Sequence, residues 1–588
     1  MVLIVHSLVA AMATLGSISA AKSDQVLLGP SSEPPSHLSN NPIIQKAVLD
    51  ITRSLNDAVR TGNSRFGSFN SSTTSLSLTA ISQLESSPII DFHHTSGSLN
   101  VSAGSTSRVT GDTVYRIGSV SKLFTVYALL LNNGTSYWNR PVTDFVPELR
   151  KAVYSSPDRY TSVVNSVQWD QVTVGALASQ LSGIGRDCYS GDVAVLDFPW
   201  TQLGLPSLSA QDIPTCGIND GQLPCSRKEY FAGYVQRHAV FPTYSKAMYS
   251  NGAYRILAYV LEAITGKSYE EVVKNEIFQP LGMKHSSVLP PSGKGKGVIP
   301  DGDAGWSREY GDEVATGGLL SSTNDLVKFG RAIFSNKQLS AMETLRWMKP
   351  NSFTASPSLS IGAPWEIVRT RSGITTGHVV DLYTKSGSVG AYQSLIILVP
   401  DYQVTLAVLA AGPDASAAVQ VATEITIQTL LPALEEAAKE ESCSKLCGVY
   451  SPLTDVSQDS SLVITVDDGP GLLVKSWIHQ GHDLIAAGQA YANATRGGQI
   501  QSVRLFPSGL KTSSRAAYRA IFQRLLPTDD ASVHKVFDPA AESWGMPDQL
   551  MYGGIAVDEF VFHVDAANGS AAAVEPCVLR TVFQRLEM

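Results

Sequence analysis

Apolar residues recur at helical spacing in several stretches of the chain. Between 44 and 59 they occupy positions 44, 48, 49, 51, 55 and 59, which predicts an amphipathic helix. Similar patterns predict helices at 253–264, within 317–334 after a glycine turn, and at 414–440. Apolar runs of strand length lie at about 76–82, 87–92, 394–398 and 403–409. This part of the chain is therefore predicted to mix helices with strands.

The pattern changes after Cys447. Short segments that alternate apolar and polar residues follow one another, with turn residues between them, at 461–466, 471–476, 502–506, 516–524 and 558–564. Such a series is typical of antiparallel β structure. We therefore expect residues 441–588 to form a separate, smaller β-rich domain.

The region 183–228 has no clear periodicity. It is rich in Gly, Pro and Asp and contains three of the six cysteines. Long irregular stretches inside a compact domain usually serve as lids or binding loops, or are disordered. Our hypothesis is that the insert 186–228 overhangs a functional site and selects its substrates.

Length and composition favour a globular protein of more than one domain. The chain has 588 residues, of which 43% are hydrophobic and 16% charged, and a formal net charge of −8. It has no dense basic run, so we expect no nucleic-acid partner. Beyond the N-terminus no apolar run approaches the roughly 18–20 residues of a spanning helix, so we expect no membrane span.

The N-terminus has the features of a secretory signal. Residues 1–21 hold an apolar segment followed by small residues, which predicts cleavage near Ala21, although no Lys or Arg precedes that segment. A short N-terminal anchor or a buried first helix is the alternative. Residues 22–41 are rich in Ser, Pro and Asn and predict a linker or N-terminal arm.

The cysteines and glycosylation sequons fit secretion. Even cysteine counts in secreted proteins indicate disulfides, and the connectivity here stays open. Asn-x-Ser/Thr triplets support a secreted glycoprotein only weakly, because they also arise by chance. The cysteines are at 188, 216, 225, 443, 447 and 577, and the triplets begin at Asn70, Asn100, Asn133, Asn493 and Asn568.

Ser119 and Lys122 stand at the start of an apolar run, Leu123–Leu131. On a helix this spacing places both side chains on one face, beside the unpaired N–H groups of the helix start. A hydroxyl becomes a nucleophile when a neighbouring base takes its proton, and burial favours the neutral amine of a lysine. The spacing alone is weak evidence, because Ser442–Lys445 and Ser508–Lys511 repeat it. Only the pair at 119 and 122 opens an apolar helix.

Two further elements follow in order, and the set resembles a known superfamily. Tyr249-Ser250-Asn251 precedes a helix, and Lys385-Ser386-Gly387-Ser388 precedes a strand. With Ser119-x-x-Lys122 they resemble the serine β-lactamase and penicillin-binding-protein superfamily, in its class C-like esterase and transesterase branch. Connecting segments at 172–183, 244–283 and 315–326 are similar as well.

The resemblance implies an α+β fold for residues 42–440. This serine β-lactamase-like fold has an antiparallel sheet flanked by helices, together with a helical subdomain. The domain at 441–588 resembles the barrel-like accessory domains of some members, and no catalytic set is evident in it.

The resemblance also implies a role for each motif residue. Ser119 would attack an acyl carbonyl with help from Lys122, and Tyr249 would act as general acid/base. Lys385 would lower the pKa of Tyr249 and could hold a substrate carboxylate. The N–H groups of Ser119 and Ser388 would form the oxyanion hole.

More than one role is open for several of the motif residues. Asn251 would hold a substrate amide or fix Lys122, or it could simply cap the helix that follows. Ser386 stands where Thr is common, and Gly387 would let the backbone approach the substrate. Tyr249 could be a packing residue, and Lys385 a surface strand residue.

The sequence thus predicts a serine hydrolase that uses no metal or other cofactor. Its substrate would be a small molecule with an ester, thioester or amide bond, cleaved through a Ser119 acyl-enzyme. One alternative is an acyltransferase or transesterase of secondary-metabolite biosynthesis that uses the same site. Another is a non-catalytic, penicillin-binding-like sensor. The substrate, the acyl acceptor and the oligomeric state stay open.

Overall fold

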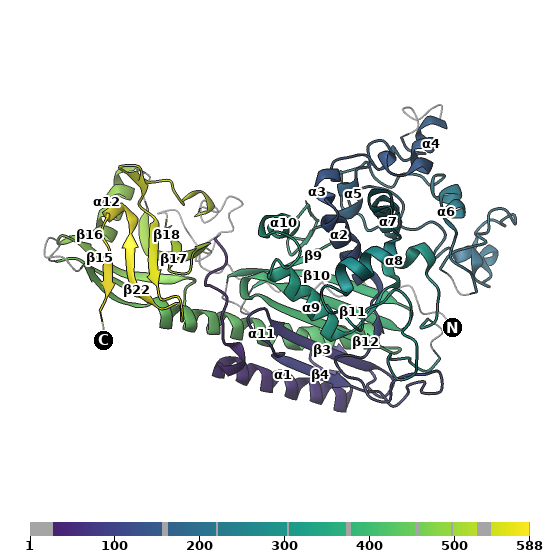
Figure 1. Ribbon diagram of the computed structural model, residues 1–588, viewed down its shortest axis with the longest axis horizontal. Coiled ribbons are helices and arrows are strands. Elements are labelled where there is room, and N and C mark those ends of the chain that lie inside the picture. The colour runs from purple at the N-terminus through teal and green to yellow at the C-terminus, as the bar shows by residue number, and fades with distance from the viewer. Residues whose placement is uncertain are drawn as a thin grey trace. The chain divides into compact units, whose positions relative to one another are not determined.

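The computed structural model describes residues 28–155, 163–218, 221–302, 305–371, 378–452, 459–495, 498–525 and 543–586. The chain divides into two compact units (Figure 1). The larger comprises 36–370 and 381–430, and the smaller comprises the first 35 residues, 371–380 and 431–588. The predicted signal peptide at 1–21 lies outside the described residues.

The larger unit is built on an eight-stranded sheet (Figure 1). The order across the sheet is β4-β3-β12-β11-β10-β9-β8-β7, with antiparallel pairing on both sides of β12. All residues of β3 and β12 are buried, which indicates cover on both faces. The strands are β3 (Ser75–Ser82), β4 (Ile90–His94), β7 (Ser352–Phe353), β8 (Leu359–Ile361), β9 (Glu366–Arg371), β10 (Val379–Val389), β11 (Tyr392–Val399) and β12 (Val404–Ala411).

Helices cover this sheet and form a subdomain above it (Figure 1). Helix α9 packs on β3 and β12, and α2 packs against α7. The helices are α1 (Pro42–Thr61), α2 (Ser121–Leu131), α3 (Gly134–Tyr137), α4 (Pro147–Ser155), α5 (Val174–Ala178), α6 (Arg227–Tyr234), α7 (Asn251–Thr265), α8 (Tyr269–Val272), α9 (Thr323–Phe334), α10 (Ala341–Trp347) and α11 (Ala415–Leu446). The two-stranded pairs are β1 (Asn63–Ser64) with β2 (Gly67–Ser68), and β5 (Tyr115–Arg116) with β6 (Leu320–Ser321). The predicted α+β fold is confirmed.

Capping residues set the helix ends that the periodicity left approximate. The Asn41 side chain accepts from the N–H groups of Ile43 and Ile44, so α1 begins at Pro42. Gly266 ends α7 with φ +68°, a left-handed conformation that favours glycine. The strand expected at 87–92 instead begins at Ile90 as β4, which pairs with β3.

The smaller unit contains a nine-stranded sheet that closes on itself. Its order is β14-β13-β23-β22-β21-β18-β17-β15-β16, and β14 also pairs with β15. The buried side chains of Tyr450, Trp477, Phe560 and Phe562 fill its interior. The strands are β13 (Gly448–Pro452), β14 (Ser461–Thr465), β15 (Leu472–His479), β16 (His482–Asp483), β17 (Gln499–Lys511), β18 (Arg515–Leu525), β21 (Glu559–Val564), β22 (Ala571–Pro576) and β23 (Phe583–Arg585). Helix α12 (Leu484–Thr495) and the pair β19 (Met551–Tyr552) and β20 (Ile555–Ala556) complete the unit.

All five strands expected in this region are present, and the separate β domain is confirmed. The predicted boundary between 440 and 441 lies inside α11, and the exact domain limits stay a prediction. Among the described residues, α11 is the one helix long and apolar enough to cross a membrane, and 56% of its most apolar window is buried. A buried core helix has the same properties, so this is weak evidence for a span.

The structure forms two disulfides, Cys216–Cys225 and Cys443–Cys447. Cys188 and Cys577 are not disulfide-bonded. Disulfides persist in oxidising compartments, so the two bridges weakly suggest an extracellular protein. Cleavage near Ala21 and glycosylation stay predictions.

Candidate active site

Ser119 lies in a short 3-10 turn, Gly118–Val120, that leads into α2. The Ser121 hydroxyl donates to the Gly118 carbonyl at 2.7 Å and closes the turn. Residues 121–130 are all buried, whereas Ser119 is partly exposed. A rigid core helix thus presents the Ser119 hydroxyl at its accessible end.

Lys122, in the first turn of α2, is wholly buried. Its Nζ lies 3.0 Å from Ser119 Oγ, 2.7 Å from Asn251 Oδ1 and 2.6 Å from the Thr316 carbonyl oxygen. Burial lowers the pKa of Lys122, although the Tyr249 phenol opposes this shift when ionised. A neutral Lys122 amine could accept the Ser119 proton.

Tyr249 lies beside the same hydroxyl. Its OH lies 2.5 Å from Ser119 Oγ. Burial alone would raise the pKa of Tyr249, but the positive charges of Lys122 and Lys385 outweigh it and hold the pKa below its usual value. The two ammonium groups lie 4.9 and 5.3 Å from the centre of the Tyr249 ring. The two positive charges therefore make the Tyr249 phenolate easier to form beside the serine.

Lys385 reaches this cluster from β10 but is paired with an acid. Its Nζ donates to Glu366 Oε1 at 2.5 Å and to the Ser386 carbonyl at 2.8 Å. The other oxygen of Glu366 accepts from the N–H and the hydroxyl of Ser386, both at 2.9 Å. Burial is the largest single effect and opposes the charge of Lys385, but the charges of Glu366 and of an ionised Tyr249, together with the hydrogen bond to Glu366, raise the pKa of Lys385 overall.

The turn at Ser119 and strand β10 touch through two glycines. A Cβ added at Gly387 would lie 2.7 Å from Ser119 N and 2.2 Å from the Ile117 carbonyl oxygen. A Cβ at Gly118, where φ is +48°, would lie 2.7 Å from Ser388 N. The segments that carry the backbone N–H groups of Ser119 and Ser388 are thus in close contact, and their role as an oxyanion hole stays a prediction.

Asn251 links Lys122 to an acid that the motifs did not reveal. Its Nδ2 lies 2.9 and 3.2 Å from the two carboxylate oxygens of Asp187. Because a carboxylate accepts and an ammonium donates, this arrangement turns Oδ1 toward Lys122. Ser250, not Asn251, caps α7, since its side chain accepts from Ala253 N. The capping interpretation of Asn251 is wrong.

The Thr316 carbonyl comes from a π-helical turn, Val314–Gly318. Thr316 Oγ1 donates to the Glu313 carbonyl at 2.8 Å, and the Glu313 carboxylate pairs with buried Arg255 at 2.9 Å. Arg255 also donates to the Cys225 carbonyl at 2.7 Å. A continuous chain of polar contacts therefore runs from Lys122 to the disulfide of the insert.

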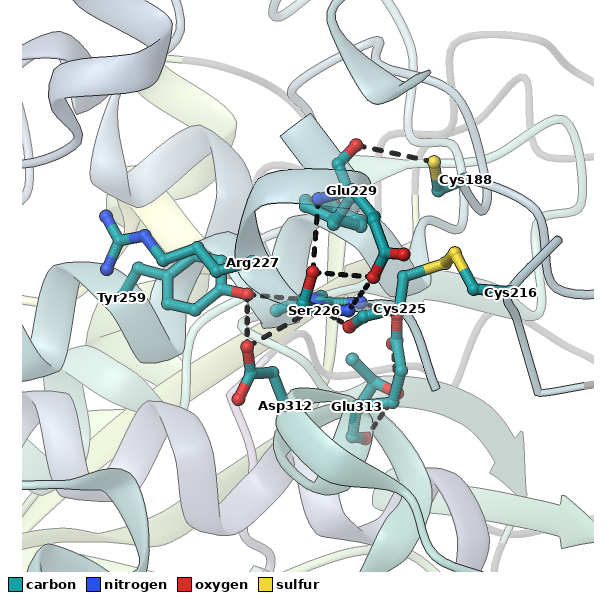
Figure 2. A network of polar contacts seen from close by, with 12 residues as sticks. Cys188, Cys216, Cys225, Ser226, Arg227, Glu229, Tyr259, Asp312 and Glu313 are labelled. Atoms are coloured by element: carbon teal, nitrogen blue, oxygen red, sulfur yellow. Dashed lines mark hydrogen bonds and ion pairs between the residues drawn. A yellow bond between two sulfur atoms is a disulfide. The ribbon is translucent and has the colours of Figure 1, made fainter. Parts of the chain in front are cut away.

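The same network includes the residues around that disulfide. Figure 2 shows Tyr259 and Asp312 facing each other on one side of this network and the Cys216–Cys225 bond on the other side. The Tyr259 hydroxyl donates to Asp312 at 2.6 Å. These contacts anchor the far end of the insert to the helical core.

The start of the insert reaches the site itself. The Arg186 guanidinium lies 4.8 Å from the centre of the Tyr249 ring and is 67% exposed. Burial raises the pKa of its neighbour Asp187. The substrate-selecting role of the insert stays a prediction.

The structure thus brings together all three motifs found in the sequence. The neighbours that sequence reasoning missed are Arg186, Asp187, Thr316 and Glu366. Asp187 and Arg186 lie in the irregular insert, whose position beside the site was the available signal. The sequence held no signal for Glu366, because the position of this residue in the site depends on the pairing of β9 with β10. Within the described residues no group of three or more His, Cys, Asp or Glu side chains could hold a metal ion.

Two features define the class of this protein. They are an antiparallel sheet and, packed against it, a buried helix that begins at a serine and a lysine. The protein has the fold of the serine β-lactamases and penicillin-binding proteins. A family model described as Beta-lactamase matches residues 93–429, and a second, described as "Beta-lactamase-like-like, C-terminal domain", matches 438–587. The chain belongs to the Beta-lactamase family.

Fungal proteins are similar over most of the chain. A "Beta-lactamase-like protein" of Arthroderma benhamiae is 30% identical, with 94% of each chain covered. "Probable hydrolase M10" of Phoma sp. is 25% identical, over 82% of this chain and 80% of that protein. "Probable hydrolase clz13" of Cochliobolus lunatus has the same identity and coverage. Relatives named as hydrolases suggest a serine hydrolase as the general class.

Proposed function

We propose that the protein is a serine hydrolase that cleaves an ester, thioester or amide of a small molecule through an acyl-enzyme on Ser119. The observation that carries the proposal is the convergence of two candidate bases on one partly exposed hydroxyl. Lys122 Nζ lies 3.0 Å and Tyr249 OH 2.5 Å from Ser119 Oγ. The pKa of each group lies below its usual value, and the positive charge of Lys122 is one cause of the shift at Tyr249.

The proposed reaction follows from this geometry. Tyr249, as the phenolate, takes the proton of Ser119 while Oγ bonds to the carbonyl carbon, and Lys122 holds both groups in place. The N–H groups of Ser119 and Ser388 stabilise the oxyanion. Tyr249 then returns the proton to the leaving oxygen, sulfur or nitrogen as its bond to carbon breaks. Water, activated in the same way, releases the acid and restores Ser119.

An activity-based probe tests the proposal. A fluorophosphonate probe should add to wild-type protein, and mass spectrometry of the peptides should locate the adduct on Ser119. Ser119→Ala should not label, whereas Ser508→Ala, which changes the exposed serine of another Ser-x-x-Lys match, should label as wild type does. Equal labelling of Ser119→Ala, or none of wild type, would contradict the proposal. Added alcohol that diverts the acyl group from water would identify a transesterase.

A further inference from the structure

Glu366 occupies the groups that would hold a substrate carboxylate. In the resemblance that role belongs to the third motif, around Lys385. Here one Glu366 oxygen accepts a hydrogen bond from the Lys385 ammonium, and the other accepts from both the N–H and the hydroxyl of Ser386. The strand therefore presents its cation and its hydroxyl already bound to an internal anion.

Burial and a main-chain hydrogen bond stabilise the Lys385–Glu366 ion pair. The Lys385 side chain is 1% exposed, against 26% for Glu366. The Glu366 carbonyl also accepts from Thr384 Oγ1 at 2.6 Å, so the main chain of Glu366 is fixed to β10. Of the two charged groups, the Glu366 carboxylate is therefore the one that solvent can reach, while the Lys385 ammonium is covered.

The charges have a direct consequence for a ligand. A substrate carboxylate would have to displace Glu366 from three donors or lie beside it as a like charge. An uncharged ester or amide meets neither obstacle, because the N–H groups proposed to bind its carbonyl, those of Ser119 and Ser388, are not among the donors that Glu366 takes. The lowered pKa of Tyr249 is kept as well, since Lys385 stays protonated.

We propose that Glu366 is a specificity-determining residue that restricts the site to uncharged acyl substrates. This inference rests on the proposed serine hydrolase function. It assigns to Lys385 an electrostatic role toward Tyr249 rather than a role in binding a substrate anion. The substrate class is a neutral ester or amide, with no carboxylate next to the scissile bond.

Matched esters test the inference. The first pair is 3-carbamoylphenyl acetate and 3-carboxyphenyl acetate, which differ in the charge of the leaving phenol. The second is p-nitrophenyl pentanoate and mono-p-nitrophenyl glutarate, which differ in the charge of the acyl group. Wild type should favour the neutral member by about tenfold or more in kcat/KM, as a like-charge contact implies. Glu366→Gln, which keeps a hydrogen-bond acceptor for Ser386, should reduce that preference about tenfold.

Asp381→Asn is the matched control. Asp381 pairs with Arg369 at 2.9 Å between the same two strands, so the change removes an equivalent charge from another ion pair. Its neutral-to-anionic ratio should equal that of wild type. If Glu366→Gln fails to fold, inhibition of wild type by phenylboronic acid and 3-carboxyphenylboronic acid decides, with the neutral compound expected to bind more tightly.

Three results would overturn the inference. One is equal wild-type rates on both members of each pair, and another is an unchanged ratio in Glu366→Gln. A third is fast cleavage of the anionic esters that is lost in Arg186→Gln, which would make exposed Arg186 the anion site. If wild type neither cleaves any ester nor takes the fluorophosphonate, the proposed function itself fails, and the inference with it.

Discussion

Two helices of this protein carry the same serine–lysine spacing in opposite surroundings. Ser119 and Lys122 stand at the start of α2, whereas Ser442 and Lys445 lie in the last turns of α11. Lys122 is completely buried among a hydroxyl, an amide oxygen and a carbonyl. Lys445 is 31% exposed and pairs with Glu441 at 2.5 Å.

The difference shows what turns a spacing into a reactive pair. The start of a helix is its positive end and disfavours an ammonium, while the last turn favours one. Burial without a directly bonded carboxylate lowers the pKa of Lys122. Lys445 instead has a carboxylate partner, Glu441, one turn earlier on the same helix.

The largest effect should come from replacing Lys122 with methionine, and the same change at Lys445 is the control. Lys122→Met removes a candidate base and the group that positions Ser119, Asn251 and the Tyr249 phenol. We expect kcat/KM on a neutral ester to fall by roughly 10²–10⁴-fold. Lys445→Met should leave kcat/KM at the wild-type value. Comparable losses in both variants, or in neither, would remove the distinction between the two helices.

A smaller effect is expected at Asp187. Asp187→Ala frees Asn251 to rotate, so its Oδ1 no longer faces Lys122 at all times. A misplaced positioning group should lower kcat roughly ten- to a hundredfold. Asp192→Ala is the control, because Asp192 belongs to the same insert and only caps a local turn. Steady-state kinetics of the two variants should differ, and equal kinetics would leave Asp187 without a role in positioning.

The smallest effect concerns pH dependence. A phenolate base requires loss of the Tyr249 proton, so kcat/KM should rise with pH and level off below the usual tyrosine pKa. Lys385→Gln removes one of the charges that lower the pKa of Tyr249, and the midpoint should move to higher pH. Lys445→Met should keep the wild-type midpoint. A midpoint that moves to lower pH, or not at all, would mean that Lys385 does not act on Tyr249.

Periodicity and the resemblance together predicted the fold class and the motif residues, but strands β7, β8, β9 and β10 of the main sheet were not expected. Long amphipathic segments such as α1 and α7 were evident from periodicity. The first two motifs stand at helix starts as expected, whereas the third, expected before a strand, lies within β10. The C-terminal unit was harder: β22 is rich in alanine and has little apolar contrast, and β23 has three residues. These short strands depend on their neighbours rather than on local pattern.

The missed site residues share a physical reason. Thr316 contributes a main-chain carbonyl, which any residue type can supply. Glu366 depends on which residue of β9 lies beside Lys385, and that depends on strand order and register. Asp187 is positioned by an irregular loop. Such contacts arise from tertiary structure, so no local spacing could reveal them.

The contact between the Gly118 turn and β10 restricts the side chain at one position of β10 and leaves the next position free to vary. At Gly387 there is no room for even a methyl group. At Ser388 the proposed contribution is a main-chain N–H, while the side chain is exposed. An exchange at position 388 could therefore reshape substrate recognition at little cost to the chemistry. Position 388 is accordingly where laboratory evolution of new selectivity should begin.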